Sequence, residues 1–146
     1  MLTDAEEAAQ FAQAKPLVEA MFDMSVDLVT RRGNFLPYGG ALAEDGTVAY
    51  ISAADDRDQT DATRVMPLVH DAVRARLKDS QDVAVAISDS VFIGAEGEPA
   101  IKVLVEHRGG MCRALYMPFR TRMLRKPTFG DVKAVKAAPE VRGWNN

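Results

Sequence analysis

The sequence predicts an α+β domain in which two main helices pack on an antiparallel sheet of about five strands. Two segments repeat apolar residues at three- and four-residue spacing, which is typical of amphipathic helices. The remaining apolar runs have the length of strands and are joined by glycine-containing turns. The expected order is helix, strand, strand, helix, strand, strand, strand and a C-terminal tail, all in one domain of residues 1–146.

The N-terminal segment, residues 1–33, is predicted to be helical. Thr3 and Glu6 have the spacing of a capping box, and Gly33 suits the C-terminal cap. Pro16 lies inside the apolar pattern, so we expect it to kink the helix or to split it in two.

A hairpin follows, because Asp45-Gly46 stands between two apolar runs and this dipeptide strongly favours a tight turn. A two-residue loop at Asp45-Gly46 would place Leu42 opposite Ala49. The adjacent glycines Gly39-Gly40 indicate a bulge, or a place where another backbone comes close.

The second helix is predicted over residues 63–78, after a polar, acidic loop. The loop and its end carry four aspartates, Asp55, Asp56, Asp58 and Asp61, but no glycine or terminal glutamate stands where a calcium loop needs one. His70 lies at the edge of this helix's apolar stripe. The run at residues 83–87 is apolar on both faces, which is typical of an interior strand.

The last two predicted strands, residues 101–108 and 111–119, are joined by Gly109-Gly110. If these glycines form a two-residue loop, His107 lies opposite Cys112 on one face, and Glu106 lies opposite Arg113 on the other. The tail, residues 120–146, is expected to add a last strand or an extended segment that packs across the body.

The His107–Cys112 pair has two interpretations. A thiol beside an imidazole can act as an activated nucleophile. The same face of the hairpin is otherwise apolar, so the favoured interpretation is a buried cysteine that acts as a small hydrophobic residue and reacts slowly. Glu106 and Arg113 are either a ligand contact or, preferably, a cross-strand ion pair. Tyr38 completes the set of candidate ligand-binding residues.

Composition excludes several classes of function. The single cysteine and the two histidines rule out an internal disulfide and argue against a zinc or histidine-rich metal site, and no metal or other cofactor is expected. No apolar run is long enough to cross a membrane, the N-terminus does not have the features of a secretion signal, and an isoelectric point near 5.4 argues against nucleic-acid binding. We therefore expect a cytoplasmic protein.

Two hairpin motifs resemble those of a family of small bacterial proteins that has no established activity. The first is Phe35-Leu-Pro37-Tyr38-Gly39 with Asp45-Gly46 behind it, and the second is Glu106-His107-Arg108-Gly109 followed by Pro118-Phe119. The element order is separately similar to profilin-like and roadblock-like domains. Since neither resemblance brings an activity, no functional residue is carried over from it.

The function expected from the sequence is that of a non-catalytic binding or interaction domain, and the alternative is a small-molecule enzyme that uses His107 and Cys112. Residues 1–99 carry a net charge of −10 and residues 100–146 a net charge of +7, with a basic run at residues 120–126. Met24 and Val26 lie off the first helix's apolar stripe. We therefore expect a homodimer through that helix or a sheet edge, with charge complementarity at its rim, and a protein partner is the other possibility.

Overall fold

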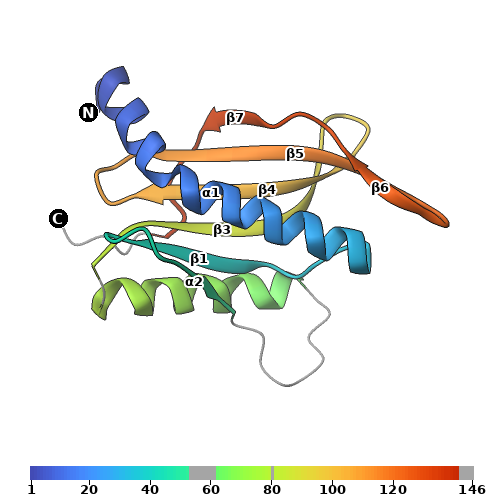
Figure 1. Cartoon of the computed structure of the whole chain (residues 1–146), viewed down its shortest axis with the longest axis horizontal. Coiled ribbons are helices and arrows are strands. Elements are labelled where there is room, and N and C mark those ends of the chain that lie inside the picture. Colours follow the sequence, from blue (N-terminus) through green and yellow to red (C-terminus); the bar gives the residue numbers. More distant parts are fainter. Residues whose placement is uncertain (53–61, 80, 142–146) are drawn as a thin grey trace.

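The computed structural model describes residues 1–52, 62–79 and 81–141, and it confirms the α+β class and the predicted element order (Figure 1). The helices and strands are α1 (Asp4–Arg32), β1 (Tyr38–Ala43), β2 (Val48–Ile51), α2 (Ala62–Asp79), β3 (Asp82–Ile93), β4 (Glu98–His107), β5 (Cys112–Arg122), β6 (Arg125–Phe129) and β7 (Lys133–Lys136). The predicted tail thus supplies two further strands, β6 and β7.

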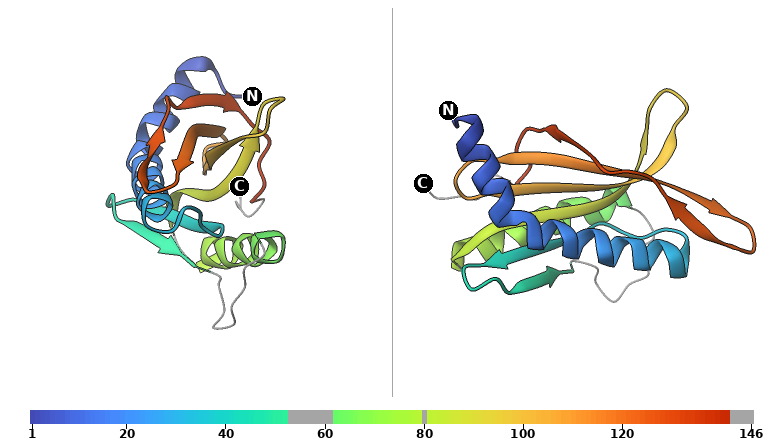
Figure 2. Two further views of the ribbon diagram at one scale, coloured as in Figure 1. Left: turned by 90° about the vertical axis from the view of Figure 1, so that its right-hand side faces the viewer. Right: turned by 45° about the horizontal axis from the view of Figure 1, so that its top comes forward.

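The strands form one antiparallel sheet in the order β2-β1-β3-β4-β5-β6, and β7 pairs with β5 beside β6. Successive side chains of β3 point to opposite faces of this sheet. Ala84 and Ala86 belong to a core with α1, whereas Val85 and Ile87 belong to a core with α2. The two helices therefore cover opposite faces of β3, which explains why its first half is apolar on both sides (Figure 2).

The α1 helix is one continuous element that changes direction in its N-terminal half (Figure 2). The predicted capping box is present, since the Thr3 hydroxyl accepts from the Glu6 backbone N–H and the Glu6 carboxylate accepts from the Thr3 N–H. Gly33 ends the helix in the left-handed conformation. Pro16 does not split the helix, because packing along the sheet holds both halves together.

Both predicted two-residue hairpin loops are in fact three-residue loops, so both predicted registers are wrong by one residue. The Ala43 N–H donates to the Thr47 carbonyl (2.9 Å), and the His107 N–H donates to the Met111 carbonyl (2.8 Å). A two-residue type I′ loop needs a positive φ at both central residues, but only the last residue of each loop has one, Gly46 at 89° and Gly110 at 110°.

These loops combine a type I turn with a left-handed glycine, and the pairing moves accordingly. Ala41 lies opposite Ala49, whereas the sequence predicted Leu42 there. In the second hairpin, Cys112 lies opposite Glu106 instead of His107. A shift of one residue moves a side chain to the other face of the sheet, so the correction changes which residues can act together.

The glycine pair of β1 lies where the two helices come closest to the sheet. A Cβ on Gly39 would lie 2.7 Å from the Val73 side chain of α2, and a Cβ on Gly40 would lie 2.5 Å from the Met21 sulfur of α1. The close approach at this pair is made by helix side chains, whereas the sequence predicted another backbone there. The predicted bulge lies elsewhere, between Leu42 and Ala43.

Met24 and Val26, which the sequence placed outside the apolar stripe, are partly buried against the core of their own chain. They therefore give no support to a dimer interface at that point of α1. None of the helices in residues 1–52, 62–79 and 81–141 combines the length and apolar character needed to cross a membrane.

Candidate functional site

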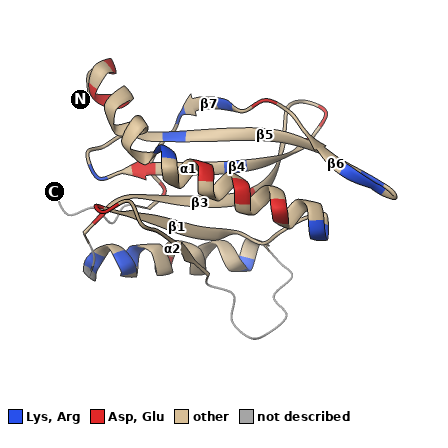
Figure 3. Ribbon diagram, viewed as in Figure 1, with Lys and Arg blue, Asp and Glu red and all other residues tan. Residues whose placement is uncertain are grey.

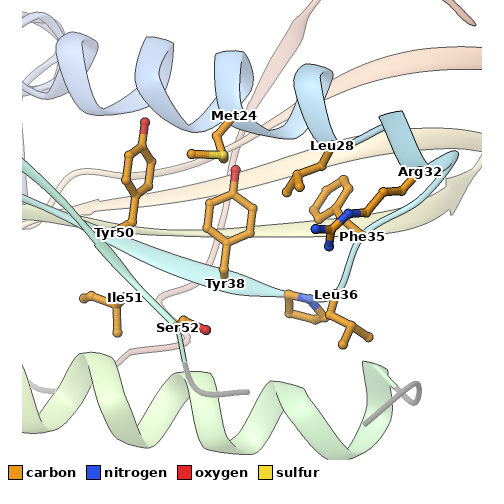
Figure 4. A pocket seen from close by; sticks show the side chains of 10 residues that line it. Met24, Leu28, Arg32, Phe35, Leu36, Tyr38, Tyr50, Ile51 and Ser52 are labelled. Carbon is orange, nitrogen blue, oxygen red and sulfur yellow. The ribbon is translucent and has the colours of Figure 1, made fainter. Parts of the chain in front are cut away.

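An apolar pocket of about 290 Å³ opens where the C-terminal half of α1 passes over β1 and β2 (Figure 4). Its walls come from α1, from the connection between α1 and β1, and from the end of β2. The lining residues are Met24, Leu28, Arg32, Phe35, Leu36, Pro37, Tyr38, Tyr50, Ile51 and Ser52. Among them, Arg32 is the one charged side chain, so the pocket combines an apolar interior with a single cation at its edge.

Tyr38 forms the back of the pocket and is held in place by α1. Its hydroxyl donates to the Met21 carbonyl (2.8 Å) and lies 2.7 Å from the Ser25 hydroxyl. Burial raises the pKa of Tyr38, and the hydrogen bond with the Ser25 hydroxyl offsets part of that effect. Since its polar atom is satisfied by the helix, Tyr38 presents an apolar ring face to the pocket.

Two further aromatic rings pack against Tyr38 in the wall of the pocket. Phe35 packs edge-on against it, with ring centroids 5.9 Å apart, and Tyr50 lies 6.3 Å away at a tilt. The Tyr50 hydroxyl donates to the Ala20 carbonyl of α1 (3.3 Å), although the residue is 48% exposed. Both tyrosines thus direct their hydroxyls to the helix backbone, while their rings line the cavity.

Arg32 is the last residue of α1, and its side chain lines the same pocket as Phe35 (Figure 4). Its neighbour Arg31 forms an ion pair with Asp27 one turn earlier. Arg32 has no ion-pair partner among the described residues. Its planar group of five N–H donors is therefore available to a carboxylate, which it can bind through two parallel hydrogen bonds.

The His107–Cys112 pair predicted from the sequence does not exist, because the two side chains lie on opposite faces of the sheet. His107 follows Val105 on the face that α1 covers, and Cys112 packs with Leu104 and Ala114 on the other face. The three-residue loop of the β4–β5 hairpin causes the separation. No thiol–imidazole chemistry can arise from this arrangement.

His107 is instead part of a closed hydrogen-bond network with α1. Its Nδ1 accepts from the Gly109 N–H (2.8 Å), so the proton of the neutral ring is on Nε2, which donates to Gln13 Oε1 (2.7 Å). Gln10 holds the same turn, since its Oε1 accepts from the Met111 N–H (2.9 Å). Burial, followed by the charge of Arg108, lowers the pKa of His107.

Cys112 is buried, and its thiol is poorly suited to nucleophilic chemistry. Burial, reinforced by the nearby Glu106 and Glu140 carboxylates, raises the pKa of Cys112 from 9.0 to about 12. At neutral pH the group is therefore a thiol, in agreement with the interpretation that the sequence favoured.

Glu106 also has a structural role. Its buried carboxylate accepts from the backbone N–H groups of Glu140 (3.0 Å) and Val141 (2.8 Å), which fixes the end of the described chain on this face of the sheet. Burial raises the pKa of Glu106, and the two N–H donors partly oppose that shift.

Arg113 does not pair with Glu106 as predicted, because it lies on the face that α1 covers. Its guanidinium lies 4.8 Å from the centre of the Phe11 ring and 3.8 Å from the Glu7 carboxylate. Glu106 and Arg113 lie on opposite faces of the sheet, so the two form no ligand site together.

The other polar candidates supply no metal or catalytic centre within the part of the chain that the structure describes. Asp55, Asp56, Asp58 and Asp61 lie outside it. His70 is half-buried on α2, as expected, and its Nε2 has no hydrogen-bond partner there. Among the described side chains, no three His, Cys, Asp or Glu residues gather closely enough to hold a metal ion.

No protein-family model, curated protein or solved structure matches this chain. The resemblance of its two hairpin motifs to a bacterial family, and of its element order to profilin-like and roadblock-like domains, stays a prediction.

The sequence pointed to one residue of the pocket, Tyr38, and missed the remainder. Phe35 and Pro37 stand in the same short motif as Tyr38, between a helix end and a strand. A dense group of aromatic and proline residues at such a junction was the available signal. Met24, Leu28 and the residues of β2 gave no signal, because they are indistinguishable from core residues in the sequence.

Proposed function

We propose that this chain is a non-catalytic binding domain whose pocket between α1 and β1–β2 takes a small carboxylate with an aromatic or similarly apolar body. The observation that carries the proposal is the combination of an apolar lining, which includes three aromatic rings, with one guanidinium that has no ion-pair partner among the described residues. Apolar pockets with a few well-placed polar groups are the usual form of small-molecule sites.

The size of the pocket limits the ligand. A volume of about 290 Å³ corresponds to roughly ten water-sized groups, since a water molecule occupies about 30 Å³ in the liquid. A monocyclic aromatic acid with a short side chain fits this limit. With about 11 non-hydrogen atoms, such a ligand is expected to bind with a dissociation constant of roughly 0.1–1 mM.

The orientation of the ligand follows from where the polar groups lie. The carboxylate would pair with the Arg32 guanidinium at the edge, and the apolar body would pack against the rings of Tyr38 and Tyr50. The hydroxyls of both tyrosines are bound to α1 carbonyls, so they are not placed to act as a general acid or base towards the ligand. This favours binding over catalysis.

The alternative of an enzyme that uses His107 and Cys112 has no geometric support, because the two side chains are on opposite faces. The cytoplasm is the compartment we propose, since a single thiol needs no oxidising environment and Cys112 has no disulfide partner in the sequence.

The test is a titration of the isotope-labelled chain with 3-phenylpropanoate, followed by NMR. We expect saturable shift changes at Met24, Leu28 and Tyr50, and none at His107, which lies at the other end of α1. The uncharged 3-phenylpropanamide, which has the same shape, should bind more weakly. Shift changes that do not saturate, or that gather outside the pocket, would refute the proposal.

A further inference from the structure

The β5–β6 hairpin projects from the body as an arm, defined here as residues 120–128 (Figures 1 and 2). Two apolar side chains form its tip, where Met123 is 90% and Leu124 is 99% exposed. Leu124 has a φ of 63°, a left-handed conformation that is costly for a residue other than glycine. A strained turn thus holds two apolar side chains in solvent, which the fold of a single chain does not require.

Four cationic side chains flank this tip, and few carboxylates lie near them. They are Arg120, Arg122, Arg125 and Lys126 (Figure 3). Arg122 lies directly opposite Arg125 in the hairpin, and like charges in that position destabilise a strand pair. Arg120 lies 4.0 Å from Glu98, whereas the other three cations have no ion-pair partner among the described residues. The arm therefore gains from an acidic surface that contacts it.

A matching surface lies on the same molecule, in a groove between α1 and β5 with a volume of about 290 Å³. We call it the α1–β5 groove. Its floor is apolar and consists of Phe11, Val18, Phe22, Leu115 and Met117, with Val132 at one side.

Two exposed carboxylates, Glu19 and Asp23, stand at the rim of the α1–β5 groove, four residues apart on α1 (Figure 3). Like charges at that spacing destabilise a helix. Lys15 also lines the groove, but neither acid has an ion-pair partner among the described residues. The groove therefore has the opposite charge to the arm and an apolar floor that suits the arm's tip.

We propose that the arm of one copy of this chain docks in the α1–β5 groove of a second copy. Met123 and Leu124 would pack on the apolar floor, while Arg122 and Arg125 would face Glu19 and Asp23. Because each copy carries both surfaces, a two-fold dimer makes the contact twice. The charges at the rim give the contact its specificity and its dependence on salt.

This interface is separate from the proposed ligand pocket. The pocket uses the C-terminal half of α1 together with β1 and β2, and the groove uses the middle of α1 together with β5. It also replaces the interface expected from Met24 and Val26, which pack on their own core. The dimer and the ligand site can therefore be tested independently.

The test uses sedimentation of the full chain and of charge-reversal variants. The arm variant is Arg122→Glu/Arg125→Glu, and the groove variant is Glu19→Lys/Asp23→Lys. We expect the wild type to sediment at twice the 15.9 kDa chain mass at high micromolar concentration and low salt, and less so in 0.5 M salt. Each variant should raise the dissociation constant of the dimer by about tenfold or more.

Mixing the two variants distinguishes this contact from general charge effects. An equimolar mixture should recover the dimer, because the reversed arm of one variant then meets the reversed groove of the other, while the unaltered arm meets the unaltered groove. The control Lys78→Glu/Arg108→Glu makes the same change in charge as the arm variant, at exposed residues outside the arm and the groove, and should sediment as the wild type does. Circular dichroism checks that all variants are folded.

Three outcomes would overturn the proposal. The wild type could be a monomer at several hundred micromolar, or both variants could keep the wild-type dimer, or the mixture could fail to recover it. A monomeric wild type that binds vesicles containing phosphatidylserine, and loses that binding in the arm variant, would assign the arm to an anionic lipid surface instead.

Discussion

Polar side chains have different roles at the two ends of α1. At the N-terminal end, Gln10 and Gln13 form hydrogen bonds with the β4–β5 turn and with the His107 ring. At the C-terminal end, the hydroxyls of Tyr38 and Tyr50 bond to the helix backbone. An apolar cavity remains there, and the Arg32 guanidinium that lines it has no ion-pair partner among the described residues. The residues with the richest chemistry, His107 and Cys112, thus have structural roles, while apolar residues line the proposed ligand site.

This contrast arises from the way each end is packed. The β4–β5 hairpin is pressed against α1, so that a Cβ on Gly109 would lie 2.5 Å from the Gln10 side chain. Burial there penalises charge, which lowers the pKa of His107. At the other end, the helix stops at Gly33 and the chain turns into β1 through Phe35 and Pro37, which leaves space between the helix and the sheet.

The largest effect we expect concerns Cys112, on the closed hairpin. With a pKa of about 12 instead of 9.0, its thiolate fraction near pH 8 is about a thousandfold smaller than that of an ordinary exposed thiol. Alkylation by iodoacetamide should be slower by a similar factor in the native protein than in the protein unfolded in guanidinium chloride. Equal rates would mean that this hairpin is open and reactive.

Filling the pocket should abolish ligand binding without unfolding the protein. In the variant Leu28→Trp, the larger side chain would fill the pocket. We therefore expect the affinity for 3-phenylpropanoate to fall by about thirtyfold or more. The matched control is Leu68→Trp on α2, where the leucine is already 41% exposed. If both variants bind the acid as the wild type does, the ligand site lies elsewhere.

The smallest effect that we expect concerns the pH dependence of stability, which the buried His107 hydrogen-bond network influences. A histidine whose folded-state pKa is lowered stabilises the native state above its unfolded pKa of about 6.5, and this contribution is lost as the pH falls below that value. Lowering the pH from 7.5 to 5.5 therefore removes this contribution in the wild type and not in His107→Gln. We expect Tm(pH 7.5) minus Tm(pH 5.5) to be about 2–4 °C more positive in the wild type than in the variant.

Comparing this variant with the wild type is necessary because Glu106 acts in the opposite direction. Its raised pKa favours the native state as the pH falls. Glu106 is present in both proteins, so its effect cancels in the comparison. A wild type and a His107→Gln variant with the same pH dependence would contradict the assignment of His107 as a buried neutral ring.

Much of the fold could be predicted because local signals were strong. Thr3, Glu6 and Gly33 mark the ends of α1, and the run at residues 83–87 marks a strand that is covered on both faces. The register of the two hairpins could not be predicted, since Asp45-Gly46 and Gly109-Gly110 are compatible with two- and three-residue loops. The one-residue difference in loop length determines whether His107 and Cys112 lie on the same face of the sheet.

The pocket was harder to predict for a different reason. Met24 and Leu28 have the spacing of core residues, and nothing in a sequence shows that a sheet turns away from the end of a helix. Arg32 reads as a cation that suits the negative end of the helix dipole, a role it shares with Arg31. Only the structure distinguishes the two arginines: Arg31 pairs with Asp27, and Arg32 lines the cavity.

The most direct test of the central claim uses that pair of neighbouring arginines. Titration calorimetry would compare the wild type, Arg32→Gln and Arg31→Gln, each with 3-phenylpropanoate and with 3-phenylpropanamide. We predict that Arg32→Gln weakens binding of the carboxylate by about tenfold and leaves binding of the amide unchanged, while Arg31→Gln changes neither. A carboxylate that binds all three proteins equally well, or no better than the amide, would contradict the claim that this pocket recognises a carboxylate through Arg32.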